Sequence, residues 1–146
     1  MPEKMIKNII VKAPANDVFA LWKDFEQFPK FMKNIKSVRR VEGHTSHWTM
    51  REHLGKCLEW TAKMTDVIEN KRIAWSSISR DLKTSGQVTF NQLNDNETDV
   101  TVHMQYVPPA GALGKMAAHL FENPQKDLEE DLRRFKEYAE GRVISK

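Results

Sequence analysis

Two side chains of this chain have the chemistry of an acid or a base in an otherwise apolar setting. Glu52 shares strand parity with Trp48 and Met50, and Tyr106 lies in a run of alternating apolar residues. Burial tunes the pKa of a carboxyl, and a tyrosine hydroxyl can polarise a carbonyl. Each residue also has a structural interpretation. Glu52 lies near Gly55, where a carboxylate reaches water, and Tyr106 suits the rim of a pocket.

The remaining reactive residue types do not form a recognisable site. His47 and His53 share a strand face but lie about 20 Å apart along an extended strand, too far for one metal ion to bridge. The single cysteine, Cys57, has outward parity and no partner evident in the sequence. Gly111 and Gly114 are too few for a phosphate-binding loop. The sequence therefore predicts no metal and no cofactor.

The overall composition is that of an ordinary globular domain, with 40% hydrophobic and 29% charged residues. A length of 146 residues fits a single domain, which we expect to span residues 1–146. The net charge of +3 comes without an arginine-rich tract, so no nucleic acid partner is predicted. We find no signal-peptide pattern and no apolar segment of about eighteen residues, which predicts a cytoplasmic protein without a transmembrane segment.

One run of basic residues extends from Lys30 to Arg40 and includes Lys33, Lys36 and Arg39 without an intervening acid. We interpret it as the solvated edge of a strand. The alternative is a weak docking surface for an anionic membrane or an acidic partner.

A long pattern of alternating residues predicts the sheet that must position the candidate side chains. A first strand is expected over Met5–Lys12, and period-two alternation then runs in six segments. The segments are Ile35–Glu42, His44–Leu54, Lys56–Ile68, Arg72–Ile78, Ser85–Leu93 and Glu97–Val107. Their short connections make neighbours antiparallel. Each strand has one apolar side, so one face of the sheet must be covered.

Helical patterns lie before and after the six segments. Pro14 opens a short amphipathic helix, and phenylalanines at steps of three then predict a second short turn or helix. The stretch Ala110–Glu140 has an apolar stripe at helical period and is the only element long enough to cover the sheet. At Pro124 this helix either kinks or begins a second segment. The expected fold is α+β, a seven-stranded curved antiparallel sheet wrapped on a long C-terminal helix.

Several short motifs, in this order and spacing, resemble those of a known superfamily. They are Ala13–Phe19, Glu59–Ala62, Arg72–Trp75, Gly86–Phe90, Thr98–Val102, Tyr106–Pro109 and Asp131–Lys136. From about Ile9 to Glu140 the chain resembles the START-like (SRPBCC, helix-grip) superfamily, and within it the polyketide cyclase/dehydrase-like or Coq10-like branch. The resemblance implies a hydrophobic cavity between the sheet and the C-terminal helix for lipids, sterols, quinones or polyketides. It does not imply one chemistry.

Three hypotheses follow. The first is a carrier or sequestering protein for a small hydrophobic molecule, held by inward residues of the sheet and of the helix. The predicted lining is Trp48, Met50, Trp60, Met64, Trp75, Phe90, Val102, Met104 and Tyr106 from the sheet, and Leu113, Ala117, Leu120 and Phe121 from the helix. The second is a cyclase or dehydratase that uses Glu52 or Tyr106. The third is a Coq10-like membrane- or partner-binding module that uses the basic run. The sequence indicates no oligomeric state.

Overall fold

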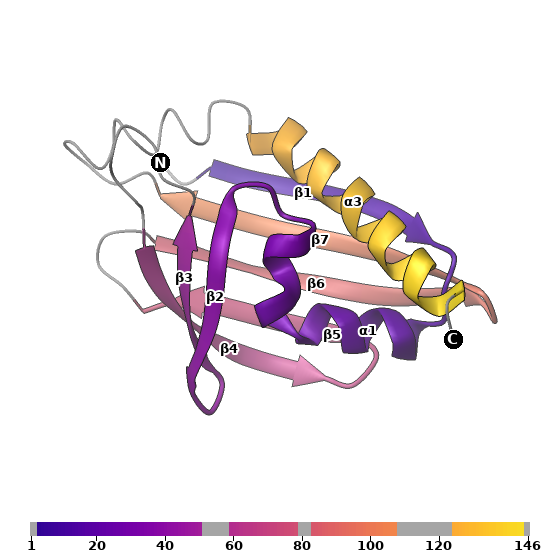
Figure 1. Cartoon of the computed structure of the whole chain (residues 1–146), viewed down its shortest axis with the longest axis horizontal. Coiled ribbons are helices and arrows are strands. Elements are labelled where there is room, and N and C mark those ends of the chain that lie inside the picture. The colour runs from indigo at the N-terminus through magenta and orange to yellow at the C-terminus, as the bar shows by residue number, and fades with distance from the viewer. Residues whose placement is uncertain (1–2, 51–58, 79–82, 108–123, 145–146) are drawn as a thin grey trace.

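The computed structural model describes residues 3–50, 59–78, 83–107 and 124–144 of the chain. In chain order the elements are β1 (Glu3–Val11), α1 (Ala15–Lys23), the 3-10 helix η1 (Phe25–Lys30), β2 (Ile35–Glu42), β3 (Thr45–Met50), β4 (Glu59–Ile68), β5 (Arg72–Ser77), β6 (Lys83–Asn94), β7 (Glu97–Val107) and α3 (Pro124–Ile144). The expected α+β helix-grip architecture is confirmed, with α1 and α3 on the same face of the sheet (Figure 1).

A single seven-stranded sheet in the order β1-β7-β6-β5-β4-β3-β2 carries the fold. All of its neighbouring strands are antiparallel, so β2 to β7 form a meander and β1 adds beside β7. The register from Glu3↔Tyr106 to Val11↔Thr98 extends β1 two residues before the expected start at Met5. Pairing with β7 therefore decides where β1 begins, because the first residues of β1 carry no strand pattern of their own.

The alternation expected from the sequence places the apolar side of each strand toward the helices. In β3, Ser46, Trp48 and Met50 are buried while the residues between them are partly exposed. In β4, Trp60, Ala62 and Met64 are buried in the same way. Because successive side chains of a strand point to opposite faces, this pattern gives the sheet one apolar inner face.

Two short helices cover one part of this inner face. The buried residues of α1 recur at helical spacing, namely Ala15, Val18, Phe19 and Trp22. In η1 the spacing is three, and Phe25 and Phe28 are both buried. Side chains three residues apart are eclipsed in a 3-10 helix, so this spacing directs both rings to one side.

The C-terminal helix α3 covers the sheet beside β1 and runs to Ile144, four residues beyond the expected end at Glu140. Its buried stripe is Leu128, Leu132, Phe135 and Ala139, as the sequence predicts. Polar groups of α3 also pair with the free edge of β1. The Lys136 ammonium donates to the Ile10 carbonyl (3.0 Å), and Glu140 accepts from the Lys12 amide (2.8 Å). These bonds occupy backbone groups that an open sheet edge leaves unpaired.

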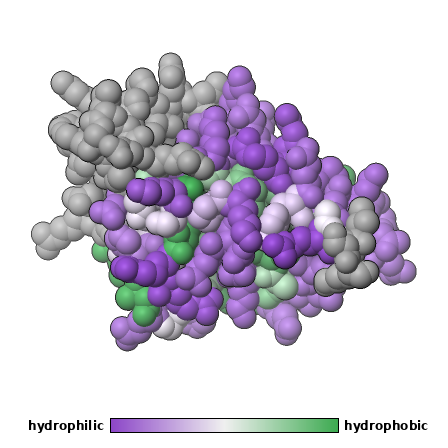
Figure 2. Space-filling view, viewed as in Figure 1, coloured by the Kyte–Doolittle hydropathy of each residue, from purple (hydrophilic) through white to green (hydrophobic). Residues whose placement is uncertain are grey.

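The basic run lies along η1 and the other sheet edge. Lys36, Arg39 and Arg40 are exposed on β2, the edge strand opposite β1. Lys33 instead pairs with Asp127 (3.2 Å) on α3. The face shown in Figure 2 is predominantly hydrophilic, with apolar residues visible in smaller areas. Within the described ranges, no helix is long and apolar enough to cross a membrane.

Candidate functional site

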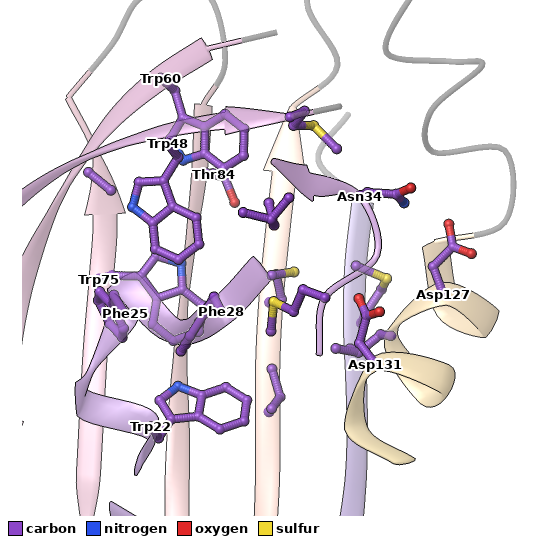
Figure 3. Close-up of a pocket in the computed structure, with 18 residues that line it drawn as sticks. Trp22, Phe25, Phe28, Asn34, Trp48, Trp60, Trp75, Thr84, Asp127 and Asp131 are labelled. Atoms are coloured by element: carbon purple, nitrogen blue, oxygen red, sulfur yellow. The ribbon is translucent and has the colours of Figure 1, made fainter. Parts of the chain in front are cut away.

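A partly open cavity of about 140 Å³ lies between the sheet and the helices. Every strand and helix described above contributes to its wall, as Figure 3 shows for the labelled side chains. The lining residues are Met5, Trp22, Phe25, Phe28, Met32, Asn34, Ile35, Trp48, Met50, Trp60, Ala62, Trp75, Thr84, Val102, Met104, Asp127, Leu128 and Asp131. The wall is thus mainly aromatic and methionine side chains with a few polar groups, which is the usual character of a small-molecule site.

A wall of aromatic rings is built where β3 and β4 pair. Trp48 lies opposite Trp60 in the register, and the two indoles stack with centroids 5.8 Å apart and an interplanar angle of 14°. The rings of Phe25 and Phe28 pack on Trp48 at 5.5 and 5.3 Å. The Trp48 indole N–H donates to Ser46 Oγ (2.9 Å), so its one polar atom is satisfied within the wall. Such contacts fix the rings, and a rigid wall is expected.

Trp22 lines the cavity and packs against Phe135 of α3. The two rings meet edge to face with centroids 4.8 Å apart, and Trp22 also packs on Phe28 at 5.4 Å. The Trp22 side chain is 1% exposed, yet its indole N–H finds no hydrogen-bond acceptor among the described residues. A buried donor without an acceptor costs about 1–3 kcal/mol. The Trp22 nitrogen is therefore an exception to the rule that buried polar atoms are hydrogen-bonded, and packing alone does not explain it.

The position of Trp75 depends on a glycine in the neighbouring strand. Gly86 lies between Trp75 on β5 and Met104 on β7 in the register. A Cβ atom at Gly86 would lie 2.8 Å from Cζ2 of the Trp75 ring and 2.5 Å from the His103 carbonyl oxygen. The absence of a side chain at this position thus leaves room for the indole against the sheet.

The polar lining residues are Asn34, Thr84 on β6, and two carboxyls of α3. Asp127 and Asp131, one turn apart, both line the cavity. Asp131 Oδ1 accepts from Arg134 Nη2 (2.5 Å) and, more weakly, from the Lys33 amide (3.4 Å). Arg134 Nε also donates to the Phe31 carbonyl (2.9 Å), which anchors the guanidinium.

Charge and burial shift the pKa values of Asp131 and Lys33. Desolvation raises the pKa of Asp131 above its ordinary value, although the bond from Arg134 acts in the opposite direction. The hydrogen bond and the charge of Asp127 raise the pKa of Lys33, which also lies 3.6 Å from Glu130. Asp131 is therefore a carboxyl beside an apolar cavity whose proton is held more tightly than usual, a feature common at functional sites.

Six residues of the predicted lining surround this cavity in the structure. They are Trp48, Met50, Trp60, Trp75, Val102 and Met104. Two other predicted lining residues are buried elsewhere. Phe90 packs on the rings of Phe19 (5.6 Å) and Trp22 (6.5 Å), and Met64 lies beside a separate small crevice with Phe25 and Val38.

The other predicted positions are not described. Leu113, Ala117, Leu120, Phe121 and Glu52 lie outside the described residues, and so does the side chain of Tyr106. The acid–base roles of Glu52 and Tyr106 therefore stay predictions.

The predicted lining did not include the residues that α1, η1 and the described part of α3 contribute to the cavity. Trp22, Phe25 and Phe28 belong to the apolar sides of the two short helices predicted there, and Asp131 entered the sequence analysis only as part of the Asp131–Lys136 motif. The phenylalanine spacing of three was the available signal for η1, because it places rings on one side. No local pattern distinguishes Asp131 from the exposed acids around it.

A second hollow, of about 490 Å³, lies on the outer side of the sheet around β1, β5, β6 and β7. Its wall is mixed, with the polar residues Gln87, His103 and Gln105 beside apolar ones such as Ile6. Its lining is much less apolar than that of the interior cavity, so it suits an apolar ligand less well despite the larger volume. In the described part of the chain, no three metal-ligating side chains lie together.

Comparison with known proteins shows what this chain is similar to. It is 27% identical over 139 residues to an uncharacterized 17.2 kDa protein of Streptomyces lincolnensis, covering 95% of this chain and 91% of that protein. It shares its fold with the Zhui aromatase/cyclase from a Streptomyces species (TM-score 0.79, 18% identity, 98% and 96% of the chains). A START superfamily protein from Mycobacterium smegmatis is also similar (TM-score 0.67, 20% identity, 97% of each chain).

The sequence match identifies the family. Residues 11–133 match the family described as polyketide cyclase / dehydrase and lipid transport, and this span includes every strand from β2 to β7. The family resemblance expected from the sequence is therefore confirmed: the chain belongs to the polyketide cyclase/dehydrase and lipid transport family, with a START-like helix-grip fold.

Proposed function

We propose that this protein binds a small hydrophobic molecule in the interior cavity, as a carrier or sequestering protein. The observation that carries the proposal is the aromatic cavity itself, an unfilled volume of about 140 Å³ walled by four tryptophans. Well-packed interiors leave few voids larger than a water molecule. A space of this size beside fixed aromatic rings is therefore better explained by a guest than by incomplete packing.

The volume also indicates the scale of the guest. An engineered apolar cavity of about 150 Å³ in another protein binds benzene. The cavity described here is close to that size, so it accommodates one aromatic ring with small substituents. Drug-sized ligands need about 300 Å³ or more. A larger lipid or polyketide would therefore extend beyond this volume.

Transfer of the ligand from water into the cavity supplies the driving force for binding. Burying apolar surface is worth about 25 cal/mol per Å², and a ring in the cavity also contacts polarizable indole and thioether groups. Met50, which is 1% exposed, and the stacked Trp48–Trp60 pair present such groups. We expect binding in the range of small fragments rather than of large ligands.

A cavity-filling variant tests the proposal. Ala62→Leu on β4 adds three carbons at a lining position and is expected to abolish binding of toluene, measured by ligand-observed NMR or calorimetry. Ala74→Leu on β5 adds the same atoms at a position that does not line the cavity and is expected to retain binding. The absence of saturable binding to the unmodified protein would reject the proposal. Equal binding by Ala62→Leu would reject the site.

One observation favours acid–base chemistry as a second candidate function. Asp131 lines the cavity, and its desolvated carboxyl keeps a proton at higher pH than an exposed aspartate does. A cyclase or dehydratase needs an acid of this kind beside an apolar substrate. Turnover of a polyketide-like substrate that is unchanged in Asp131→Asn would remove Asp131 from this role.

A further inference from the structure

The polar groups of the cavity wall are mostly hydrogen-bond acceptors. The Thr84 hydroxyl donates its hydrogen to the Gln105 carbonyl oxygen (3.2 Å), so only its lone pairs remain. The ionised carboxyls of Asp127 and Asp131 accept only, and the Asn34 amide both donates and accepts. A ligand that pairs with this wall therefore needs a donor more than it needs an acceptor.

The acidic side of the wall carries an excess of negative charge. Asp127 pairs with Lys33 at 3.2 Å, and Glu130 shares the same ammonium at 3.6 Å. Asp131 pairs with Arg134 at 2.5 Å. Among these five side chains, three acids share two cations, so one further positive charge would balance the cluster.

Asp131 is the carboxyl best placed to receive that charge. Its hydrogen bonds with described residues, from Arg134 and from the Lys33 amide, both end on Oδ1, so Oδ2 accepts neither. The side chain lines the cavity and is 14% exposed, which leaves it within reach of a bound molecule. Desolvation raises the pKa of Asp131, so its ionised form lacks stabilisation that a nearby cation supplies.

The acids and the tryptophans lie on different sides of the cavity. In Figure 3, Asp127 and Asp131 project from α3 on one side, and the labelled tryptophan rings lie on the other. Trp48 and Trp60 are buried, whereas the Asp127 side chain is 21% exposed. A ligand that matches this wall has an apolar ring at one end and a polar group near water at the other.

We propose that the cavity binds a small aromatic amine in its protonated form, with the ring against the tryptophans and the ammonium group donating to the Asp131 carboxylate. The inference rests on the proposed binding function and adds the chemical class of the ligand. An ammonium group has donors and no acceptor, as the wall requires. A carboxylate ligand is disfavoured, because it would meet two acids whose cationic neighbours are already paired.

Benzylamine and benzyl alcohol form a matched pair for the test. The two molecules have nearly the same shape, but benzylamine is protonated at neutral pH and benzyl alcohol is neutral. We expect benzylamine to bind the unmodified protein about tenfold more tightly in ligand-observed NMR or calorimetry, as for a hydrogen bond to a charged group. In Ala62→Leu, which fills the cavity, both ligands are expected to lose binding. Benzylamine binding to Ala62→Leu at the parent affinity would place the amine outside the cavity and overturn the inference.

Two substitutions on α3 test the role of Asp131. Asp131→Asn keeps the shape of the side chain and removes its charge, so the preference for benzylamine is expected to disappear while benzyl alcohol still binds. Glu137→Gln removes the same charge from an exposed position that does not line the cavity, and the preference is expected to remain. A full preference in Asp131→Asn would overturn the pairing with this carboxylate.

A salt titration of the unmodified protein does not depend on a folded variant. Raising the NaCl concentration from about 10 mM to about 1 M shortens the Debye length from about 30 Å to about 3 Å, and the preference for benzylamine is expected to shrink by about threefold. Saturable binding of benzyl alcohol without a preference for benzylamine at low salt would overturn the amine inference and leave the binding function intact. Failure of both ligands and of toluene to bind would reject the binding function, and this inference with it.

Discussion

Substitution of Gly86 by alanine is expected to disturb both the stability of the sheet and the shape of the cavity. The added Cβ would lie 2.5 Å from the His103 carbonyl oxygen, 2.8 Å from the Trp75 ring and 3.2 Å from Met104 Cα. Two of these three atoms belong to the backbone of β7. That strand is paired on both sides, with β6 and with β1, so it cannot easily move away.

The expected change in the free energy of unfolding follows from two opposing effects. Forcing extra atoms into a packed position costs about 1–3 kcal/mol. Replacing glycine also reduces the entropy of the unfolded chain, which recovers about 0.4–1 kcal/mol. We therefore expect Gly86→Ala to lower the free energy of unfolding by about 1–2 kcal/mol. For a protein of this size the midpoint of thermal unfolding falls by about 3–6 °C.

Urea titration followed by tryptophan fluorescence measures this effect, and two glycines provide controls. Among the described residues, nothing outside the backbone of α3 itself lies within 4 Å of a Cβ at Gly141, so Gly141→Ala is expected to stabilise by about 0.5–1 kcal/mol. Gly43 has a φ of +51°, so Gly43→Ala is expected to destabilise through backbone strain without changing the Trp75 environment. If Gly86→Ala were as stable as the parent, with unchanged fluorescence and ligand binding, the close approach of Trp75 to Gly86 would be refuted.

Two further predictions concern α3. Burial raises the pKa of Asp131 in the folded protein above its ordinary value of 3.8. The protonated Asp131 carboxyl therefore contributes fully to stability below pH 3.8, and this contribution is lost as the pH rises through the pKa of the folded state. Urea midpoints are therefore expected to fall in the parent relative to Asp131→Asn as pH rises from about 4 to 7; a constant difference would contradict this. Phe135→Ala removes a fully buried ring that contacts Trp22 and Phe31, and calorimetry is expected to show a loss of about 3–5 kcal/mol. A loss below about 1 kcal/mol would contradict the packing described here.

Much of the fold could be predicted because its signals are local. Alternation of side chains along β7 predicted Glu97–Val107 to the residue, and helical spacing predicted the buried stripe of Leu132 and Phe135. Both patterns reflect the fixed geometry of a strand or a helix, which a short window of sequence contains. Boundaries were less certain where pairing decides them, as at the start of β1.

The cavity could be predicted only in part, because periodicity shows which side chains point inward but not which of them meet an empty space. Trp60 and Phe90 both point inward, yet Trp60 lines the cavity while Phe90 packs on Phe19. The sequence alone determined the apolar face, the order of the elements and the absence of an evident metal pattern. Tertiary packing decided that Trp22 has no acceptor among the described residues and that Asp131 is desolvated. These two properties depend on atoms distant in the chain, and no local pattern contains them.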